Sequence, residues 1–220
     1  MEDYLSEREQ VDRIRQWWKE NGAWIIVGVG GGVLALVLWN WWQGYQVDRA
    51  EEASAIYSVV TEAALEDRID EIRVGVERLE SGYGSSPYLQ HARLALAGAA
   101  ARAEEFGVAT DQLEQVMADA RDPQLKLVAR LRLARLSLSA GEPGRALELA
   151  RAAEAGAFAP AFKEIEGDAL AAQGDEAGAR AAYEAALAGA AQYGGVIDEN
   201  LLQLKLQSLS QPAATEGDAS

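Results

Sequence analysis

Few side chains in this sequence could carry out chemistry. His91 is the only histidine and there is no cysteine, so acid–base or metal chemistry would have to be built around one imidazole. His91 stands among the apolar residues Leu89, Ala92 and Leu94 of an expected helix, where a structural or groove-lining role is the simpler interpretation. We therefore expect no enzyme activity, no metal site and no cofactor.

Two other patterns with chemical potential have structural explanations. The carboxylate pairs Glu104-Glu105 and Asp175-Glu176 stand at expected turns and helix starts, where they cap helices and complement the helix dipole. The glycine-rich run at 28–32 lacks the Lys and Ser/Thr of a phosphate-binding loop and lies inside an apolar stretch. A net charge of −15 also argues against a nucleic acid partner.

The chain has one long stretch without charge, between Glu20 and Asp48. Its centre, residues 23–42, has about the length that a helix needs to cross a bilayer core of roughly 30 Å. Three tryptophans flank each end of the stretch, as in the aromatic belts of membrane helices: Trp17, Trp18 and Trp24, then Trp39, Trp41 and Trp42. Because bulky residues occupy the positions where a signal peptidase requires small ones, we interpret the stretch as an uncleaved anchor. A buried helix of a globular core is the alternative.

The orientation of the anchor follows from its basic flanks. Arg8, Arg13, Arg15 and Lys19 precede the apolar stretch, whereas Arg49 alone stands in the twenty residues after Trp42. Lys and Arg stay preferentially on the cytoplasmic side. The sequence therefore predicts a cytoplasmic N-terminus and an exported C-terminal part.

Small residues punctuate the expected membrane helix. Gly28 and Gly32 form a G-x-x-x-G pair, and Gly31 with Ala35 continues a face of small residues. Such a face lets a second helix approach closely. Gly28 and Gly32 are therefore candidate helix-packing residues, although glycine is also simply common in membrane helices.

The remainder reads as helical nearly throughout, because Ala, Leu, Glu, Arg and Gln dominate and apolar residues recur at spacings of three and four. Expected helices cover 48–65, 69–79, 88–102, 108–120, 123–140, 143–155, 159–173, 176–190 and 199–210. The predicted organisation is a cytoplasmic tail (1–22), a transmembrane helix (23–42), a periplasmic helical-repeat domain (43–210) and a disordered tail (211–220).

These helices repeat as pairs. Between residues 165 and 187, small and large residues fall on the packing positions of a 34-residue tetratricopeptide repeat: Gly167, Leu170, Gly174, Ala179, Tyr183 and Ala186. A second copy lies 33 residues upstream, and a weaker one lies around 96–113. Lys163 and Glu104 depart from the consensus. We predict an all-α protein in which a single transmembrane helix precedes a tetratricopeptide-like α-solenoid; another helical hairpin array is the alternative.

Joined together, these pieces resemble a known family. The order of segments runs as follows: Trp17–Gly22 before the apolar stretch, Trp41-Trp42 and Gln46–Ala50 after it, Leu131–Arg135, Glu166–Leu170, Gly178–Ala185 and Leu204–Leu209. It is similar to the YfgM-like ancillary subunit of the bacterial Sec translocon over roughly residues 7–210. The resemblance implies a single-pass protein of the bacterial inner membrane with a periplasmic domain. Its implied partners are the SecYEG channel, a membrane-anchored periplasmic prolyl isomerase and chaperone, and unfolded exported polypeptides.

By analogy with tetratricopeptide stacks, the first helix of each pair should line a concave groove. The candidate groove residues in the middle of the array are Leu94, Val128, Leu131, Arg135 and Leu138. We expect these leucines to be exposed apolar surface for extended polypeptide. Nearby basic residues stand out in an acidic domain, and either pair with neighbouring helices or form a docking patch for an acidic partner: Arg121, Lys126, Arg130, Arg132 and Arg135.

Fold alone does not choose a function, because helical-repeat arrays serve many assemblies. A translocon-associated scaffold with chaperone-like action is the first hypothesis. A membrane-anchored scaffold of another envelope-assembly or stress-signalling complex is the second. A signalling role for the N-terminal tail, through residues 4–19, is the third.

Overall fold

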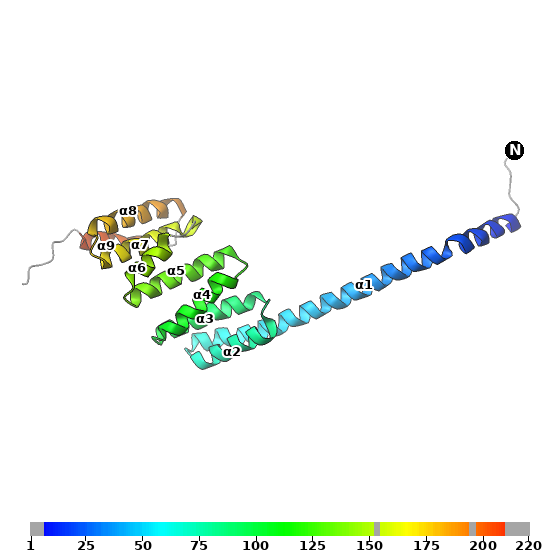
Figure 1. The fold of residues 1–220 in the computed structure, drawn as a ribbon, viewed down its shortest axis with the longest axis horizontal. Helices are drawn as coiled ribbons and strands as arrows, with labels where there is room; N and C mark the ends of the chain where they lie inside the picture. The colour runs from blue at the N-terminus through cyan, green and yellow to red at the C-terminus, as the bar shows by residue number, and fades with distance from the viewer. Residues whose placement is uncertain (1–6, 152–154, 194–196, 210–220) are drawn as a thin grey trace, which may run out of the picture. The chain divides into compact units, whose positions relative to one another are not determined.

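The computed structural model describes residues 7–151, 155–193 and 197–209. Every regular element among them is helical, as the sequence predicts (Figure 1). The elements in chain order are α1 (Glu7–Leu65), α2 (Ile69–Tyr83), α3 (Pro87–Arg102), α4 (Phe106–Asp119), α5 (Pro123–Ser139), α6 (Pro143–Arg151), a 3₁₀ turn (Gly156–Phe158), α7 (Ala159–Ala172), α8 (Glu176–Tyr193) and α9 (Glu199–Ser208). The expected tail at 211–220 lies outside the described residues.

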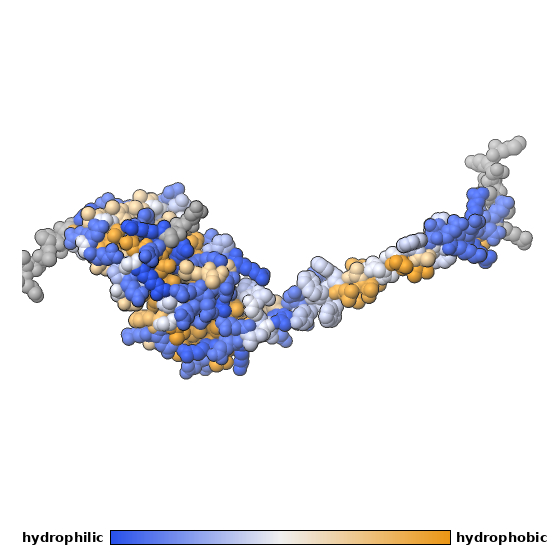
Figure 2. All heavy atoms as spheres, viewed as in Figure 1, coloured by the Kyte–Doolittle hydropathy of each residue, from blue (hydrophilic) through white to orange (hydrophobic). Residues whose placement is uncertain are grey.

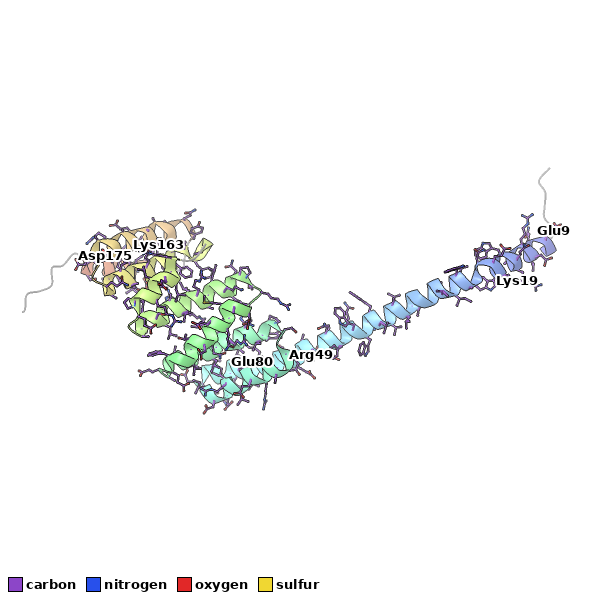
Figure 3. All side chains as sticks on the ribbon, in the orientation of Figure 1. Glu9, Lys19, Arg49, Glu80, Lys163 and Asp175 are labelled. Atoms are coloured by element: carbon purple, nitrogen blue, oxygen red, sulfur yellow. The ribbon has the colours of Figure 1, made fainter. Side chains whose placement is uncertain are left out.

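The chain divides into two compact units, residues 1–52 and 53–220. The first unit contains most of α1, whose middle is apolar (Figure 2). Its large apolar side chains are exposed, including Trp24 and Leu36. Charged residues such as Lys19 and Arg49 are labelled on either side of this part in Figure 3. By length and composition α1 can cross a membrane, and its exposed apolar surface fits a membrane anchor.

Side-chain caps fix several helix starts in the second unit. The Ser86 hydroxyl accepts a hydrogen bond from the backbone N–H of Tyr88 at 3.3 Å, and Pro87 occupies the first turn of α3. Asp122 caps α5 in the same way, with Pro123 after it. Such caps satisfy backbone groups that the helix leaves unpaired. They explain why these boundaries could be read from the sequence.

Four similar turns in the second unit each join two consecutive helices into a hairpin. Each turn has one residue with a left-handed backbone: Asp67 (φ 53°), Glu104 (φ 61°), Gly141 (φ 77°) and Gly174 (φ 82°). In all four, the next residue donates its N–H to a carbonyl five residues back, at 2.8–2.9 Å. This is the Schellman ending of a helix, and the N-terminus of the next helix follows at once. The hairpins therefore consist of the end of α1 with α2, α3 with α4, α5 with α6, and α7 with α8.

Close packing within the hairpins depends on glycine, as predicted for Gly167. A Cβ atom built on Gly167 would lie 2.3 Å from Cε1 of Tyr183, so the two helices meet where α7 has no side chain. In the first hairpin the small residue is on the second helix instead, because a Cβ on Gly75 would lie 2.2 Å from Cγ2 of Val60. Both hairpins therefore bring their helices close together, but the glycine is on the first helix in one and on the second helix in the other.

The hydrophobic core is a row of clusters along the stack, since each hairpin packs on the next (Figure 1). Ile72 and Leu79 lie in the first cluster, Leu133 in the second and Ile165 in the third, all nearly or fully buried. The fourth cluster contains Leu202 of α9, which is fully buried against α7 and α8. The helix α9 therefore covers the apolar face that the last hairpin would otherwise expose, as terminal elements of solenoids do.

Candidate functional site

The predicted groove residues lie on the first helices of the second and third hairpins. Leu94 is on α3, and the other four are on α5. Leu94 and Leu131 are only 7% exposed, and each belongs to a core cluster. The exposure that we expected for these two leucines is therefore wrong, because neighbouring hairpins cover them. Val128 and Leu138 are half-buried against the core, and Arg135 is exposed.

Basic side chains of α5 contact both backbone carbonyls and a carboxylate. Arg132 donates to the carbonyl of Leu94 at 3.2 Å, and Lys126 donates to the carbonyl of Ala118 at 3.1 Å. Arg135 forms an ion pair with Glu164 at 3.8 Å, on the first helix of the next hairpin. The two alternatives for this cluster both remain, since α5 carries four basic and no acidic side chains within Pro123–Ser139.

A polar network holds α9 against α7. Lys205 Nζ lies 2.9 Å from Glu164 Oε1 and 2.8 Å from Asp168 Oδ1. The Tyr183 hydroxyl also donates to Asp168 Oδ1, at 2.8 Å. Burial alone would lower the pKa of Lys205, but its hydrogen bonds with Asp168 and Glu164 outweigh that effect and the pKa is raised. Lys205 is thus a fixed cation, and it ties α9 to Glu164 and Asp168 of α7.

His91 is exposed on α3, with its ring 6.1 Å from the ring of Tyr57. Tyr57 also stacks on Tyr88 at 5.4 Å. No group of three His, Cys, Asp or Glu side chains suitable for a metal ion occurs among the described residues. In the part of the chain that the structure describes, the ring contact of His91 is with an aromatic side chain rather than a carboxylate.

A cavity of about 840 Å³ lies where the first three hairpins meet. The C-terminal end of α2, the first half of α3, one face of α4 and the first turn of α5 line it. Arg93 in its wall is 8% exposed and donates to Glu80 Oε1 at 2.9 Å and to Asp119 Oδ2 at 3.0 Å. Sequence reasoning missed this cavity, because its residues come from four helices and carry no shared spacing.

The comparisons with known proteins agree on one family. A family model described as a tetratricopeptide repeat-like domain matches residues 15–211. A protein of Escherichia coli (strain K12) named "Ancillary SecYEG translocon subunit" is 33% identical over 96% of this chain and 100% of its own length. Proteins with the same name from Haemophilus influenzae and Neisseria gonorrhoeae are 26% and 27% identical, over 93% and 95% of this chain and 98% and 100% of their own lengths. No solved structure matches the chain.

Proposed function

The chain belongs to the family of tetratricopeptide repeat-like ancillary SecYEG translocon subunits, and from that membership we propose that it links the SecYEG channel to periplasmic chaperones and to newly exported proteins. In this proposal α1 anchors the protein in the inner membrane, and residues 53–209 form a periplasmic scaffold with chaperone-like action. The protein acts by binding rather than by catalysis. A membrane-anchored periplasmic prolyl isomerase is the proposed chaperone partner.

The similarity over nearly the whole chain is the observation that carries this proposal. It includes the apolar part of α1 as well as the hairpin stack, so anchor and scaffold are shared together. A domain with an acidic balance on a membrane anchor also suits partners with basic surfaces. The basic helix α5 gives the same domain one place for an acidic segment.

Topology provides the first test. With four basic residues before the apolar stretch and one in the twenty residues after Trp42, the C-terminal domain should be exported. A reporter that is active only in the periplasm, fused after Leu209, should therefore be active. Protease added to spheroplasts should degrade the domain in the wild type. Activity of a cytoplasm-specific reporter at the same position would reverse the proposed orientation.

Co-purification of the SecYEG translocon with this protein provides the second test. Gly28 and Gly32 lie on α1, and a Cβ on either would meet no other atom within 4 Å in the structure. We propose that a partner membrane helix packs on them. Gly28→Leu with Gly32→Leu should therefore reduce the amount of translocon that co-purifies with the protein in mild detergent, by about tenfold if the contact contributes roughly 1.4 kcal/mol.

The matched control is Gly30→Leu with Gly44→Leu, which also adds two leucines to α1 but leaves the G-x-x-x-G pair intact. Leucine inserts well in a bilayer, so both double variants should reach the membrane at wild-type levels. Unchanged recovery with Gly28→Leu and Gly32→Leu would place the contact elsewhere on the protein. Failure of the wild type to recover any translocon component would contradict the proposed function itself.

We propose that the groove still binds an extended client, but through fewer residues than the sequence predicted. Val128, Arg135 and Leu138 retain exposed atoms on α5, while Leu94 and Leu131 are buried in core clusters. An extended client would contact the exposed residues and not the buried leucines.

A further inference from the structure

Acidic side chains are absent from two neighbouring helices of this acidic protein. The chain has a net charge of −15, yet neither α3 nor α5 contains an Asp or Glu, whereas every other α-helix that the structure describes contains at least one. The two helices are in contact, because Arg132 of α5 donates to the carbonyl of Leu94 of α3 at 3.2 Å. An anionic partner therefore meets the least repulsion where α3 and α5 adjoin.

One stripe of α5 reaches solvent at this place. Its residues follow one another at spacings of four, three and four positions, so they lie on the same side of the helix: Val128, Arg132, Arg135 and Ser139. Val128 is half-buried and the other three are exposed, whereas Leu131, Leu133 and Leu136 are buried. We call these four residues the α5 stripe.

Both arginines of the α5 stripe keep hydrogen-bond donors for a partner. Arg132 donates to a backbone carbonyl, and it has no ion pair within the described ranges. Arg135 lies 3.8 Å from Glu164, which is longer than a hydrogen bond, and Lys205 binds the other oxygen of Glu164 at 2.9 Å. A guanidinium has five N–H donors, so each arginine can still bind an incoming carboxylate.

We propose that the α5 stripe binds an extended acidic segment of a partner polypeptide, with one carboxylate on Arg132 and one on Arg135. Residues three apart on a helix have Cβ atoms about 5–6 Å apart. In an extended segment, alternate side chains point to the same face and lie about 7 Å apart. Two acidic residues separated by one residue therefore match the two arginines. The inference rests on the proposed function, because it assigns a surface to one of the polypeptides that this domain binds.

The surroundings of the α5 stripe select a short acidic segment over a polyanion. The next first helix, α7, carries Glu164, Glu166 and Asp168. A nucleic acid or an anionic bilayer presents many negative charges, which these carboxylates and the acidic chain as a whole would repel. A segment with two carboxylates avoids this repulsion if it extends from α5 over α3, where His91 is exposed and no carboxylate stands.

The first experiment removes both charges from the α5 stripe by Arg132→Gln with Arg135→Gln. The probe is a fluorescently labelled eight-residue peptide with two glutamates at alternate positions in a neutral background, and the protein is the full chain in detergent micelles. Affinity should fall by at least about tenfold, because a carboxylate–guanidinium pair is lost at each position. Arg132→Lys with Arg135→Lys keeps the charges without the fork of donors, and should lose less affinity.

The matched control is Arg78→Gln with Arg180→Gln, which removes the same charge from α2 and α8 and should leave affinity unchanged. A second peptide, with the two glutamates adjacent, tests the spacing. It should bind the wild type more weakly, because neighbouring side chains of an extended segment point to opposite faces. Equal affinity for the two peptides, or an equal loss in the control variant, would mean that only overall charge is sensed and would overturn the assignment.

A second measurement locates the peptide without changing the arginines, so it holds even if those variants fold poorly. The chain has no cysteine, so a single introduced cysteine reports on one position. A glutamate peptide with a thiol-reactive end should modify Ser139→Cys, on the α5 stripe, faster than Gln203→Cys, which is exposed on α9. Equal rates at the two positions would place the peptide elsewhere and overturn the inference.

This chain contains the same acidic pattern itself, since Glu216 and Asp218 stand at alternate positions outside the described residues. Removal of residues 210–220 should leave the affinity for the peptide unchanged. A clear rise in affinity would make this chain's own segment the occupant and would overturn the assignment to a partner. If the peptide fails to bind the wild type while the translocon still co-purifies with it, this inference fails and the proposed function stands.

Discussion

Gly167→Ala lowers the free energy of unfolding by about 2 kcal/mol, although alanine favours helices more than glycine does. The added Cβ would stand 2.3 Å from Cε1 of Tyr183. The ring cannot move aside easily, because Tyr183 is 3% exposed and its hydroxyl is bonded to Asp168. The helices α7 and α8 must therefore separate, which loosens the fourth core cluster. Chemical denaturation of the full chain in detergent, followed by circular dichroism, measures the change.

A matched substitution at Gly98 should raise the free energy of unfolding instead of lowering it. Gly98 is also inside a helix, but its added Cβ would meet only the end of the Arg102 side chain, at 3.7 Å. Gly98→Ala should therefore stabilise the protein by up to about 1 kcal/mol through helix propensity alone. Adding Tyr183→Leu to Gly167→Ala should reduce the cost of the alanine, because the smaller side chain vacates the contact. If both alanine variants stabilise the protein, the close packing at Gly167 is not present in solution.

The hairpin that contains Gly167 could be predicted because its local signals agree. Gly174 ends one helix, Ala179 and Ala186 allow close packing, and Tyr183 fills the space that Gly167 leaves. Each of these residues acts within about twenty positions of the others. The spacing alone therefore contained both the turn and the contact face.

The two helices of the first hairpin were predicted from the sequence, at 48–65 and 69–79, but their match to the repeat was not, because the turn between them uses a different residue. Asp67 takes the left-handed backbone that Gly174 takes in the last hairpin, and Asp tolerates this conformation better than most residues do. The turn is made by backbone hydrogen bonds, which leave no side-chain signature. With Val60 and Gly75 exchanging the usual large and small positions, no consensus residue remained to mark the repeat.

Exposure on α5 could not be predicted from periodicity. A helix in the middle of a solenoid contacts its own hairpin partner and the hairpins on both sides, so it buries residues on most of its faces. The buried residues of α5 include Leu131, Leu133 and Leu136, at spacings that no single stripe would give. The cavity residues Gln90 and Arg93 escaped notice for a related reason, since the partners of Arg93 are 13 and 26 residues away.

Leu131→Ser should therefore destabilise the protein strongly, by roughly 2–5 kcal/mol. Leu131 is 7% exposed and packs in the third core cluster, together with Ala161 and Ile165 of α7. Its truncation leaves a cavity between two hairpins and places a hydroxyl there. For a domain of this size the melting temperature should fall by on the order of 10 °C.

The control is Leu204→Ser on α9, where the leucine is 61% exposed. That change should alter stability by no more than about 0.5 kcal/mol. Binding of an unfolded polypeptide should be compared for both variants at a temperature where each is folded. Because Leu131 is covered by α7, its loss should weaken binding only as far as it loosens the domain. An unchanged melting temperature in Leu131→Ser, together with lost polypeptide binding, would mean that the leucine faces the groove after all and that the packing of α5 on α7 opens in solution.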